Sequence, residues 1–402
     1  MATAQPLRAP LGANRENLRQ HNLSAVLRLL HLSGAVPRTH LTSVTGLNRS
    51  TISDLVGELV ALGLVTERDA EVDGSVGRPS RVVEPTEQVV AIAVNPETDA
   101  TTVGVVSLDG RVLMRRRHPT RLRPEPEHAL RITTKLITEL RATLAPGTRI
   151  VGIGVAVPGM IRVHDGVVRF APHLGWVEVP LGTMLAQQTG LPVFVGNDAA
   201  SACTAEQLFG AARGSSHAVY LHAGSGGIGG GVVVDNQLLR GASGYAGELG
   251  HMQISSSRAT DYSGIAGSLE ALVRRDDLLE VFKLDSATDE ELDFDIMATK
   301  DPRVLRLLHR QTEDLGRAVG VLSTIFNPQT VLLGGFLTSL FKRDAPRLLA
   351  SARASAIAPA SEGLVVRGGE LGTAAVLIGA AELALAPLLE SPAGTTLTPN
   401  RR

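Results

Sequence analysis

Apolar and polar residues alternate with helical spacing in the first part of the chain, from residue 16 to about residue 62. Apolar residues recur at mostly helical spacing from Leu23 to Leu32, and Val36-Pro37-Arg38 interrupts the pattern. A short second helix is predicted over 40–44, followed by a turn at 46–48. Asn48 is a favourable N-cap for a third helix. The predicted buried face of that helix consists of Ile52, Leu55, Val56, Leu59, Val60 and Leu62.

The segment after the third helix, residues 67–83, has the pattern of a two-stranded ribbon with a Gly-Arg-Pro turn near its tip. Three helices followed by a ribbon predict a winged helix-turn-helix, in which the polar first turn of the third helix faces DNA. The expected DNA-binding residues are Arg38, Asn48, Arg49, Ser50, Thr51, Arg78 and Arg81. Two alternatives remain open: Arg78 and Arg81 belong to a solvated loop, or the helices serve only for packing.

From about residue 88 the pattern changes to strands that alternate with helices. Residues 89–94 and 102–107 are apolar strands, and Asp109-Gly110 is a hairpin turn that leads into a third strand. Residues 127–144 carry a helical apolar stripe, and a buried strand over 150–157 ends at a Pro-Gly turn. This order predicts an α/β fold.

The chain has 402 residues, of which 44% are hydrophobic, and is long enough for two or three domains. We find no apolar run long enough to span a bilayer, and the first ten residues lack the apolar core of a secretory signal. The single cysteine, Cys203, cannot form an intrachain disulfide. We therefore expect a cytoplasmic protein without membrane contact.

The formal net charge of −1 gives no overall reason to expect nucleic-acid binding. The charge of the first 55 residues does give such a reason, because only Glu16 and Asp54 oppose a larger set of arginines there. That set consists of Arg8, Arg15, Arg19, Arg28, Arg38 and Arg49. Arginine is also the main basic residue of the whole chain, which has only four lysines, so the cluster has a second explanation in the abundance of arginine.

Three Gly-bracketed segments in the α/β part carry candidate chemistry: residues 196–198, 246–251 and 264–270. They place carboxylates, an amide and an imidazole on tight turns, which suits the neighbouring hydroxyl groups of a polyol. Together these segments resemble the sugar site of the ROK family (repressors, open reading frames and kinases). The resemblance implies that sugar hydroxyls contact Asn197, Asp198, Glu248, His251 and Glu270. It aligns Asp198 with the catalytic base of the family's kinases, although Asn197 and Asp198 are also good helix caps.

The resemblance covers nearly the whole chain after residue 88 and implies two α/β lobes of the actin-like hexokinase fold. The expected fold is thus a winged helix-turn-helix over 16–85, lobe 1 over 88–205 and lobe 2, with a dimerisation surface, over 206–388. Residues 1–15 and 389–402 are expected to be flexible ends. His173 stands where the family usually has an asparagine in an Ala-Pro-Asn-Leu-Gly-Trp loop.

Two family motifs are altered. The kinases' Gly-rich phosphate loop after the first strand is replaced by residues 94–100, which contain Pro96, Glu97 and Asp99 and contribute bulk and negative charge. Three cysteines that join the family's histidine in a zinc site are absent, and the aligned stretch is 261–270. We therefore expect no catalytic residue, no cofactor and no bound metal.

These patterns predict a regulator that binds a palindromic DNA operator as a homodimer or a dimer of dimers and responds to a sugar or a sugar derivative. Repression of sugar-utilisation genes is the expected outcome. The first alternative is an ATP-dependent sugar kinase with an appended DNA-binding domain, against which the altered loop at 94–100 argues. The second alternative is a DNA-binding regulator whose sugar pocket has decayed, suggested by His173 and the missing cysteines.

Overall fold

The computed structural model describes residues 15–69, 81–120 and 123–400. The chain divides into two compact units, which we describe separately. The smaller comprises Met1–Glu87 and Ala386–Thr396, and the larger comprises Gln88–Leu385 and Leu397–Arg402.

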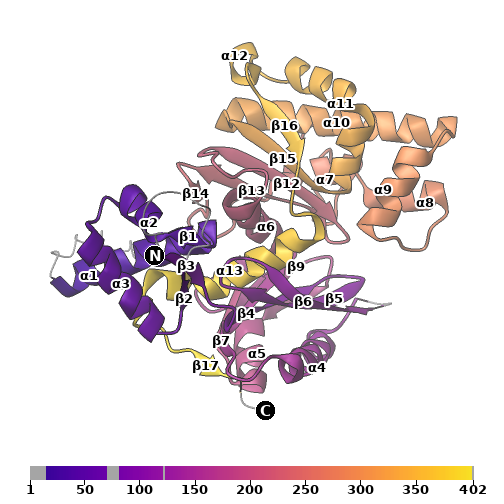
Figure 1. The fold of residues 1–402 in the computed structure, drawn as a ribbon. Coiled ribbons are helices and arrows are strands. Elements are labelled where there is room, and N and C mark those ends of the chain that lie inside the picture. Colours follow the sequence, from indigo (N-terminus) through magenta and orange to yellow (C-terminus); the bar gives the residue numbers. More distant parts are fainter. Residues whose placement is uncertain (1–14, 70–80, 121–122, 401–402) are drawn as a thin grey trace, which may run out of the picture. The chain divides into compact units, whose positions relative to one another are not determined.

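The smaller unit contains three helices and a three-stranded antiparallel sheet with the strand order β1-β3-β2 (Figure 1). Its elements are α1 (Arg15–Ser33), β1 (Val36–Pro37), α2 (Arg38–Thr45), α3 (Arg49–Ala61), β2 (Val65–Arg68) and β3 (Val82–Pro85). The predicted order of helices and ribbon strands is therefore present. The tip of the ribbon, residues 70–80, lies outside the described residues.

Asn48 starts α3 as its N-cap, because its side-chain oxygen accepts a hydrogen bond from the Thr51 amide at 2.9 Å. The buried residues of α3 are Ile52, Leu55, Val56 and Leu59. The prediction that Val60 is buried is wrong, since it is 41% exposed. The buried apolar stripe of α3 is thus narrower than the stripe predicted from the sequence, and Val60 lies at its edge, next to solvent.

The larger unit contains two main sheets, and the first has the strand order β11-β7-β4-β5-β6 with β17 paired to β7. Its strands are β4 (Val89–Pro96), β5 (Ala100–Ser107), β6 (Val112–Pro119), β7 (Arg149–Val157), β11 (Val193–Asn197) and β17 (Thr398–Pro399). Strands β4, β5 and β6 form the predicted antiparallel meander, with Gly110 in the left-handed region (φ 78°) at the hairpin turn. Apolar residues of this sheet pack with those of α4 (Pro126–Thr143) and α5 (Leu181–Thr189) in one core.

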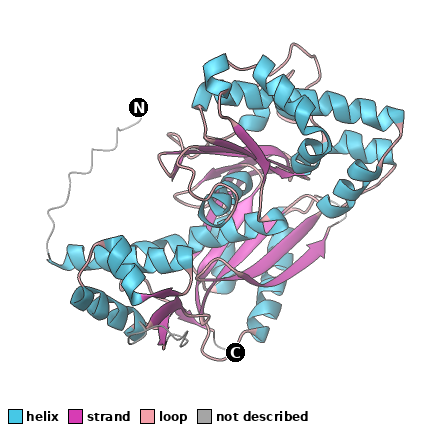
Figure 2. Ribbon diagram, turned by 45° about the horizontal axis from the view of Figure 1, so that its top comes forward, coloured by secondary structure: helices cyan, strands magenta, loops and turns pink. Residues whose placement is uncertain are grey.

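The second main sheet has the strand order β14-β13-β12-β15-β16. Its strands are β12 (Ala218–Gly224), β13 (Gly227–Val234), β14 (Gln237–Leu238), β15 (Thr330–Gly335) and β16 (Val365–Gly368). Helices α10 (Pro302–Phe326) and α11 (Phe336–Ala354) pack side by side and share a core with this sheet (Figures 1 and 2). The predicted α/β fold is confirmed, with each main sheet packed against helices of its own.

Shorter elements complete the larger unit, and several of them carry the residues of the candidate site. They are β8 (Met160–Arg162), β9 (Val167–Ala171), β10 (Trp176–Val179), α6 (Asp198–Phe209), η1 (Leu249–His251), α7 (Leu269–Leu272), α8 (Arg275–Phe282), α9 (Asp289–Ala298), α12 (Ala358–Ser361) and η2 (Gly372–Ala374). Helix α6 contacts strands of both main sheets, and therefore fixes Asp198 between them.

The last helix, α13 (Ala375–Glu390), corrects the expectation that the chain has no apolar run of membrane-spanning length. Gly372–Glu390 has the length and composition of such a span, but 61% of this apolar segment is buried inside the protein. A β-carbon at Gly154 would lie 1.7 Å from the Ala380 carbonyl oxygen, so α13 packs directly on β7. The helix is thus part of the core. Beyond it, where a free tail was expected, β17 pairs antiparallel with β7.

Candidate functional site

The structure brings the five residues predicted to contact sugar together on the wall of one cavity of about 280 Å³. They come from separate elements: Asn197 ends β11, Asp198 begins α6, Glu248 precedes the 3-10 helix η1, His251 ends it, and Glu270 lies in α7. Polar side chains that converge on a hollow of this size are typical of a small-molecule site.

Asn197 is largely occupied with local structure. Its side-chain oxygen caps α6 by accepting from the Ala200 amide at 2.8 Å, and its side-chain nitrogen donates to the Gly159 carbonyl at 3.1 Å. Asp198 accepts from the Ala199 amide through one oxygen, which leaves the other available to a ligand. Burial raises the pKa of Asp198, while the imidazoles of His222 and His173 oppose the rise. The capping interpretation therefore holds for Asn197, and Asp198 faces the cavity.

Glu270 is held in place from two sides. One carboxylate oxygen accepts from the Ile228 amide at 2.7 Å, and the other lies 3.3 Å from Nε2 of His173. Gly227 makes this possible: it has φ 87°, and a β-carbon there would lie 2.3 Å from the Glu270 carboxylate. The His173 ring also lies against Tyr262, with the ring centroids 4.1 Å apart.

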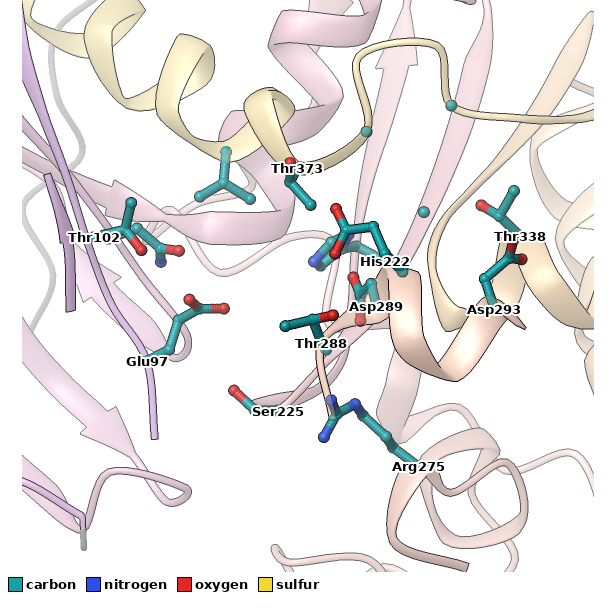
Figure 3. A pocket seen from close by; sticks show the side chains of 18 of the residues that line it. Glu97, Thr102, His222, Ser225, Arg275, Thr288, Asp289, Asp293, Thr338 and Thr373 are labelled. Carbon is teal, nitrogen blue, oxygen red and sulfur yellow. The ribbon is translucent and has the colours of Figure 1, made fainter. Parts of the chain in front are cut away.

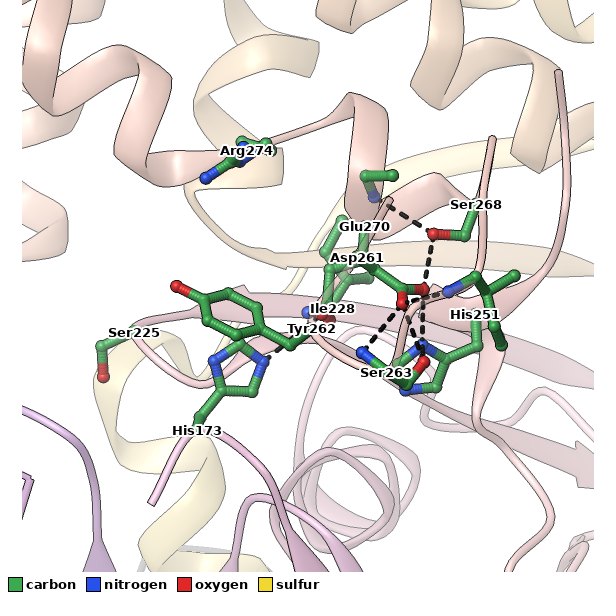
Figure 4. A network of polar contacts seen from close by, with 12 residues as sticks. His173, Ser225, Ile228, His251, Asp261, Tyr262, Ser263, Ser268, Glu270 and Arg274 are labelled. Atoms are coloured by element: carbon green, nitrogen blue, oxygen red, sulfur yellow. Dashed lines mark hydrogen bonds and ion pairs between the residues drawn. The ribbon is translucent and has the colours of Figure 1, made fainter. Parts of the chain in front are cut away.

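His251 is fixed by a hydrogen-bond network around Asp261 (Figure 4). Its Nδ1 lies 2.9 Å from Oδ2 of Asp261, whose side chain is fully buried. The hydroxyl of Ser268 donates to the same oxygen at 2.6 Å, and Ser263 donates to the other oxygen at 2.7 Å. Burial by itself raises the pKa of Asp261, but the hydrogen bonds from Ser268, His251 and Ser263 outweigh it and lower the pKa.

An ionised Asp261 accepts a hydrogen bond from Nδ1–H of His251, so Nε2 is the nitrogen left for a ligand on the other side of the ring. Nε2 lies 4.0 Å from the carboxylate of Glu248. Burial raises the pKa of Glu248, and His251 opposes the rise. The pair thus offers a hydroxyl group both a hydrogen-bond acceptor and a carboxyl group.

The residues around His251 do not fit the zinc ion of the family pattern. Ser263 and Ser268 stand where thiolates are usual, and both donate hydrogen bonds to Asp261. Within the ranges that the structure describes, no three His, Cys, Asp or Glu residues are arranged to hold a metal ion. In this chain a network of protein hydrogen bonds fixes the ring that a metal fixes elsewhere.

A second hollow, a cleft of about 380 Å³, adjoins the cavity, and Glu97, His222 and Gly224 line both (Figure 3). Glu97 follows β4 directly, in the segment that replaces the phosphate loop, and its carboxyl group points into the cleft. Burial raises the pKa of Glu97 to about 8; Asp99 adds to the rise and Arg117 opposes it. The hydroxyl of Thr98 donates to the Ser225 carbonyl at 3.2 Å, which ties this segment to the Gly-rich turn between β12 and β13.

Carboxyl groups outnumber cations on the wall of the cleft. The acidic side chains are Glu97, Asp99, Glu206, Asp289, Glu290 and Asp293, and the basic ones are Arg115, Arg117, Arg275 and Lys342. Two of the four cations pair with a carboxylate of the same wall, and the other two, Arg115 and Arg275, donate to the Thr373 hydroxyl and the Ala287 carbonyl. Arg117, for example, lies 3.0 Å from Asp99, and Lys342 lies 3.7 Å from Asp293. This cleft therefore offers a polyphosphate little uncompensated positive charge.

The residues predicted to bind DNA divide into two groups. Asn48, Arg49 and Ser50 are exposed, and Thr51 is half-buried, at the first turn of α3. Arg38 and Arg81 form intramolecular ion pairs: Arg38 bonds Glu67 through two nitrogens, and Arg81 lies 3.7 Å from the same carboxylate. Arg78 lies outside the described residues.

Sequence reasoning missed several residues of the cavity. Glu97 was considered only as an obstacle to phosphate, and His222 was not considered at all. Asp261 was given no role beyond the stretch 261–270 that replaces the zinc motif, whereas the structure shows it as the hydrogen-bond partner of His251. The signal that could have revealed this partner is the set of hydroxyl residues around Asp261, which are typical of a buried, hydrogen-bonded carboxylate.

The comparisons with known proteins agree with this geometry. The model of the ROK family matches residues 91–386. The xylose repressor of Caldicellulosiruptor bescii is 31% identical, over 80% of this chain and 84% of its own. The crystal structure of a ROK family transcriptional regulator, a homologue of the Escherichia coli MLC protein, matches with a TM-score of 0.73 and 25% identity, covering 93% of this chain and 97% of its own.

A ROK family glucokinase from Streptomyces griseus, solved with glucose and AMPPNP, matches with a TM-score of 0.62 and 26% identity. It covers 74% of this chain and 99% of its own. The chain belongs to the ROK family. The matching regulator extends over almost the whole chain, whereas the kinase leaves about a quarter of it unmatched.

Proposed function

We propose that this protein is a sugar-responsive transcriptional regulator, and specifically a repressor, which binds operator DNA through its smaller unit and a sugar or sugar derivative in its larger unit. It acts in the cytoplasm as a homodimer or a dimer of dimers. The observation that carries the proposal is that a regulator of the family aligns with 93% of the chain, including the part that kinases lack.

The smaller unit supports DNA binding as a winged helix-turn-helix. A recognition helix presents its N-terminal turn to base edges and phosphates, and the first turn of α3 is exposed here at Asn48, Arg49 and Ser50. Because Arg38 is paired with Glu67, we assign it to positioning β2 against α2, and expect Arg49 to be the principal contact.

The larger unit supports sugar binding, and it argues against a decayed pocket. A decayed site loses the contacts that hold its polar groups, yet Glu270 and His251 retain defined partners and still line the cavity. Asp198 and Glu248 remain open to a ligand on the same wall.

The cleft beside the cavity argues against kinase activity. Phosphoryl transfer depends on donors and cations placed around the phosphates, whereas this cleft has Glu97 and Asp99 at the altered loop, and its carboxyl groups outnumber its cations. The bond from Thr98 to Ser225 also joins the two loops directly. We therefore assign no catalytic role to Asp198.

DNA binding is tested by fluorescence anisotropy with a labelled duplex from the region upstream of the protein's own gene, at several salt concentrations. We expect salt-sensitive binding that Arg49→Ala weakens by roughly 1–3 kcal/mol. Arg169→Ala, which removes the same charge at an ion pair of the larger unit, is the matched control and should have little effect. A folded protein that binds no duplex would refute the proposal.

Kinase activity is tested separately by incubating the protein with Mg²⁺, ATP and a panel of hexoses and pentoses and measuring ADP. We expect no sugar-dependent ADP. A turnover that Asp198→Asn abolishes would instead establish the kinase alternative.

A further inference from the structure

The wall of the sugar cavity has an unusual charge composition. Among the described residues that line it, the titratable groups are four carboxyl groups and three imidazoles, with no arginine and no lysine. They are Glu97, Asp198, Glu248, Glu270, His173, His222 and His251. Sites that bind phosphate or carboxylate groups rely on guanidinium, ammonium or clustered backbone N–H donors.

The nearest cations are directed elsewhere. Arg117 pairs with Asp99 and Arg275 donates to the Ala287 carbonyl, and both line the larger cleft only. The guanidinium carbon of Arg123 lies over the ring of Tyr262, 5.8 Å from the ring centroid. The imidazoles of His173 and His251 each already contact a carboxyl group of the protein, Glu270 and Asp261 respectively.

The Gly-rich turn does not compensate for the missing cations. The amide of Ile228, at the start of β13, already donates to Glu270. Gly226 and Gly227 are held close to Pro158 and Glu270, since a β-carbon at either would lie within 2.8 Å of them. A phosphate entering here would meet the Glu270 carboxylate rather than a ring of open N–H groups.

Glu97 stands at the end of the cavity that opens into the cleft, where a substituent projecting from a bound sugar would extend. It lines both hollows. Arg117, the cation that acts on Glu97, is paired with Asp99, and the imidazole of His222 acts on both Asp198 and Asp289. The carboxyl group of Glu97 can accept a hydrogen bond from a sugar hydroxyl there. A phosphate group in the same place would lie beside the carboxyl oxygens of Glu97 and Asp198, with no arginine or lysine among the described residues that line the cavity.

We infer that the effector is an uncharged, unphosphorylated sugar, and that Glu97 excludes phosphorylated sugars from the cavity. This inference rests on the proposed function, because it assumes that the cavity is the effector site. It goes beyond that function by fixing the chemical class of the effector and by assigning a specificity role to a residue of the altered loop.

The experiment is isothermal titration calorimetry of the full chain with matched pairs: glucose, mannose, N-acetylglucosamine and N-acetylmannosamine, each beside its 6-phosphate, with xylose and ribose beside their 5-phosphates. We expect at least one uncharged sugar to bind, and its phosphate ester to bind at least a hundredfold more weakly. A phosphate ester that binds as tightly as its parent sugar, or more tightly, overturns the inference and leaves the regulator proposal standing. If no member of any pair binds while the protein binds DNA, both the inference and the sugar part of the proposed function fail.

Variants at Glu97 test the specificity role. In Glu97→Lys, the ratio of affinities for sugar and phosphate ester should fall at least tenfold, and in Glu97→Gln it should fall by a smaller factor. Glu290→Lys is the matched control: Glu290 is exposed at the start of α9, lines only the cleft, and undergoes the same change of charge. Circular dichroism checks that each variant is folded. If Glu97→Lys does not fold, the affinity ratio of Glu97→Gln tests the specificity role instead. An unchanged ratio in a folded Glu97 variant, or an equal change in Glu290→Lys, contradicts the assignment.

Discussion

The two adjoining hollows of the larger unit differ in how their polar groups are held. In the sugar cavity, Glu270 and His251 are fixed by directed hydrogen bonds from Ile228 and Asp261, and their remaining atoms face a ligand. In the cleft, carboxyl groups outnumber cations, and Arg117 and Lys342 pair with Asp99 and Asp293 of the same wall. The contrast teaches that a fold shared with kinases can keep the geometry that recognises a sugar without keeping the charges that handle a phosphate.

The largest effect we expect comes from a pair of glycines in the same backbone conformation. Gly227 and Gly264 both have φ 87°, but a β-carbon at Gly227 would meet Glu270 and His173, whereas nothing lies within 4 Å of one at Gly264. Gly227→Ala should therefore cost about 4 kcal/mol of unfolding free energy and abolish sugar binding, against about 1 kcal/mol for Gly264→Ala. Urea denaturation and calorimetry measure the two effects. Equal costs would show that Glu270 is not held as tightly as described.

The next effect concerns the network that fixes His251. Asp261→Ala leaves the hydroxyls of Ser268 and Ser263 and the Nδ1 of His251 without their shared acceptor. We expect a loss of about 3 kcal/mol of unfolding free energy and a 10- to 100-fold loss of sugar affinity, with DNA binding unchanged. Because the network replaces a metal site, added zinc should restore neither quantity. Full sugar affinity in the variant would remove the positioning role of Asp261.

A third effect is a pH dependence at the boundary of the two hollows. The folded state raises the pKa of Glu97 from 4.5 to about 8, so between these values the folded protein keeps a proton that the unfolded chain loses. Glu97 therefore leaves the free energy of unfolding unchanged at pH 4, where it is protonated in both states. It lowers the free energy of unfolding more and more as the pH rises toward 8. Glu97→Gln should match the parent at pH 4 and exceed it by about 2 kcal/mol at pH 9. Urea unfolding at the two pH values checks this, and a constant difference would contradict it.

Much of the fold could be predicted from the sequence because its signals are local. Asn48 caps α3 as its residue type suggests, and Gly110 occupies the hairpin turn that an Asp-Gly pair favours. The Gly-rich run after residue 224 belongs to the tight pairing of β12 and β13, where Gly231 leaves room for Cys203. Close pairing of strands against a neighbouring helix favours Gly, because it has no side chain to place between them.

The arrangement of the site was less predictable because it depends on contacts between distant segments. The five predicted residues do share one cavity, but only the structure shows that Asn197 is occupied with capping and that Arg38 is paired with Glu67. A sequence pattern indicates which residues are polar, not which of them have their hydrogen bonds satisfied within the protein. For the same reason, the burial that raises the pKa of Glu97 was not predictable.

The central claim is that the sugar cavity controls DNA binding. The measurement that tests it most directly is the affinity for the same labelled duplex of the parent protein and of Glu248→Ala. Each affinity is measured with and without the sugar found by calorimetry. Glu248 faces the cavity beside His251 and lies far in sequence from the smaller unit. We predict that the sugar weakens DNA binding of the parent protein by a coupling of roughly 1–3 kcal/mol, and that Glu248→Ala binds the duplex as well as the parent but does not respond to the sugar. A variant that loses DNA binding in the absence of sugar, or that responds to the sugar as the parent does, would contradict the account.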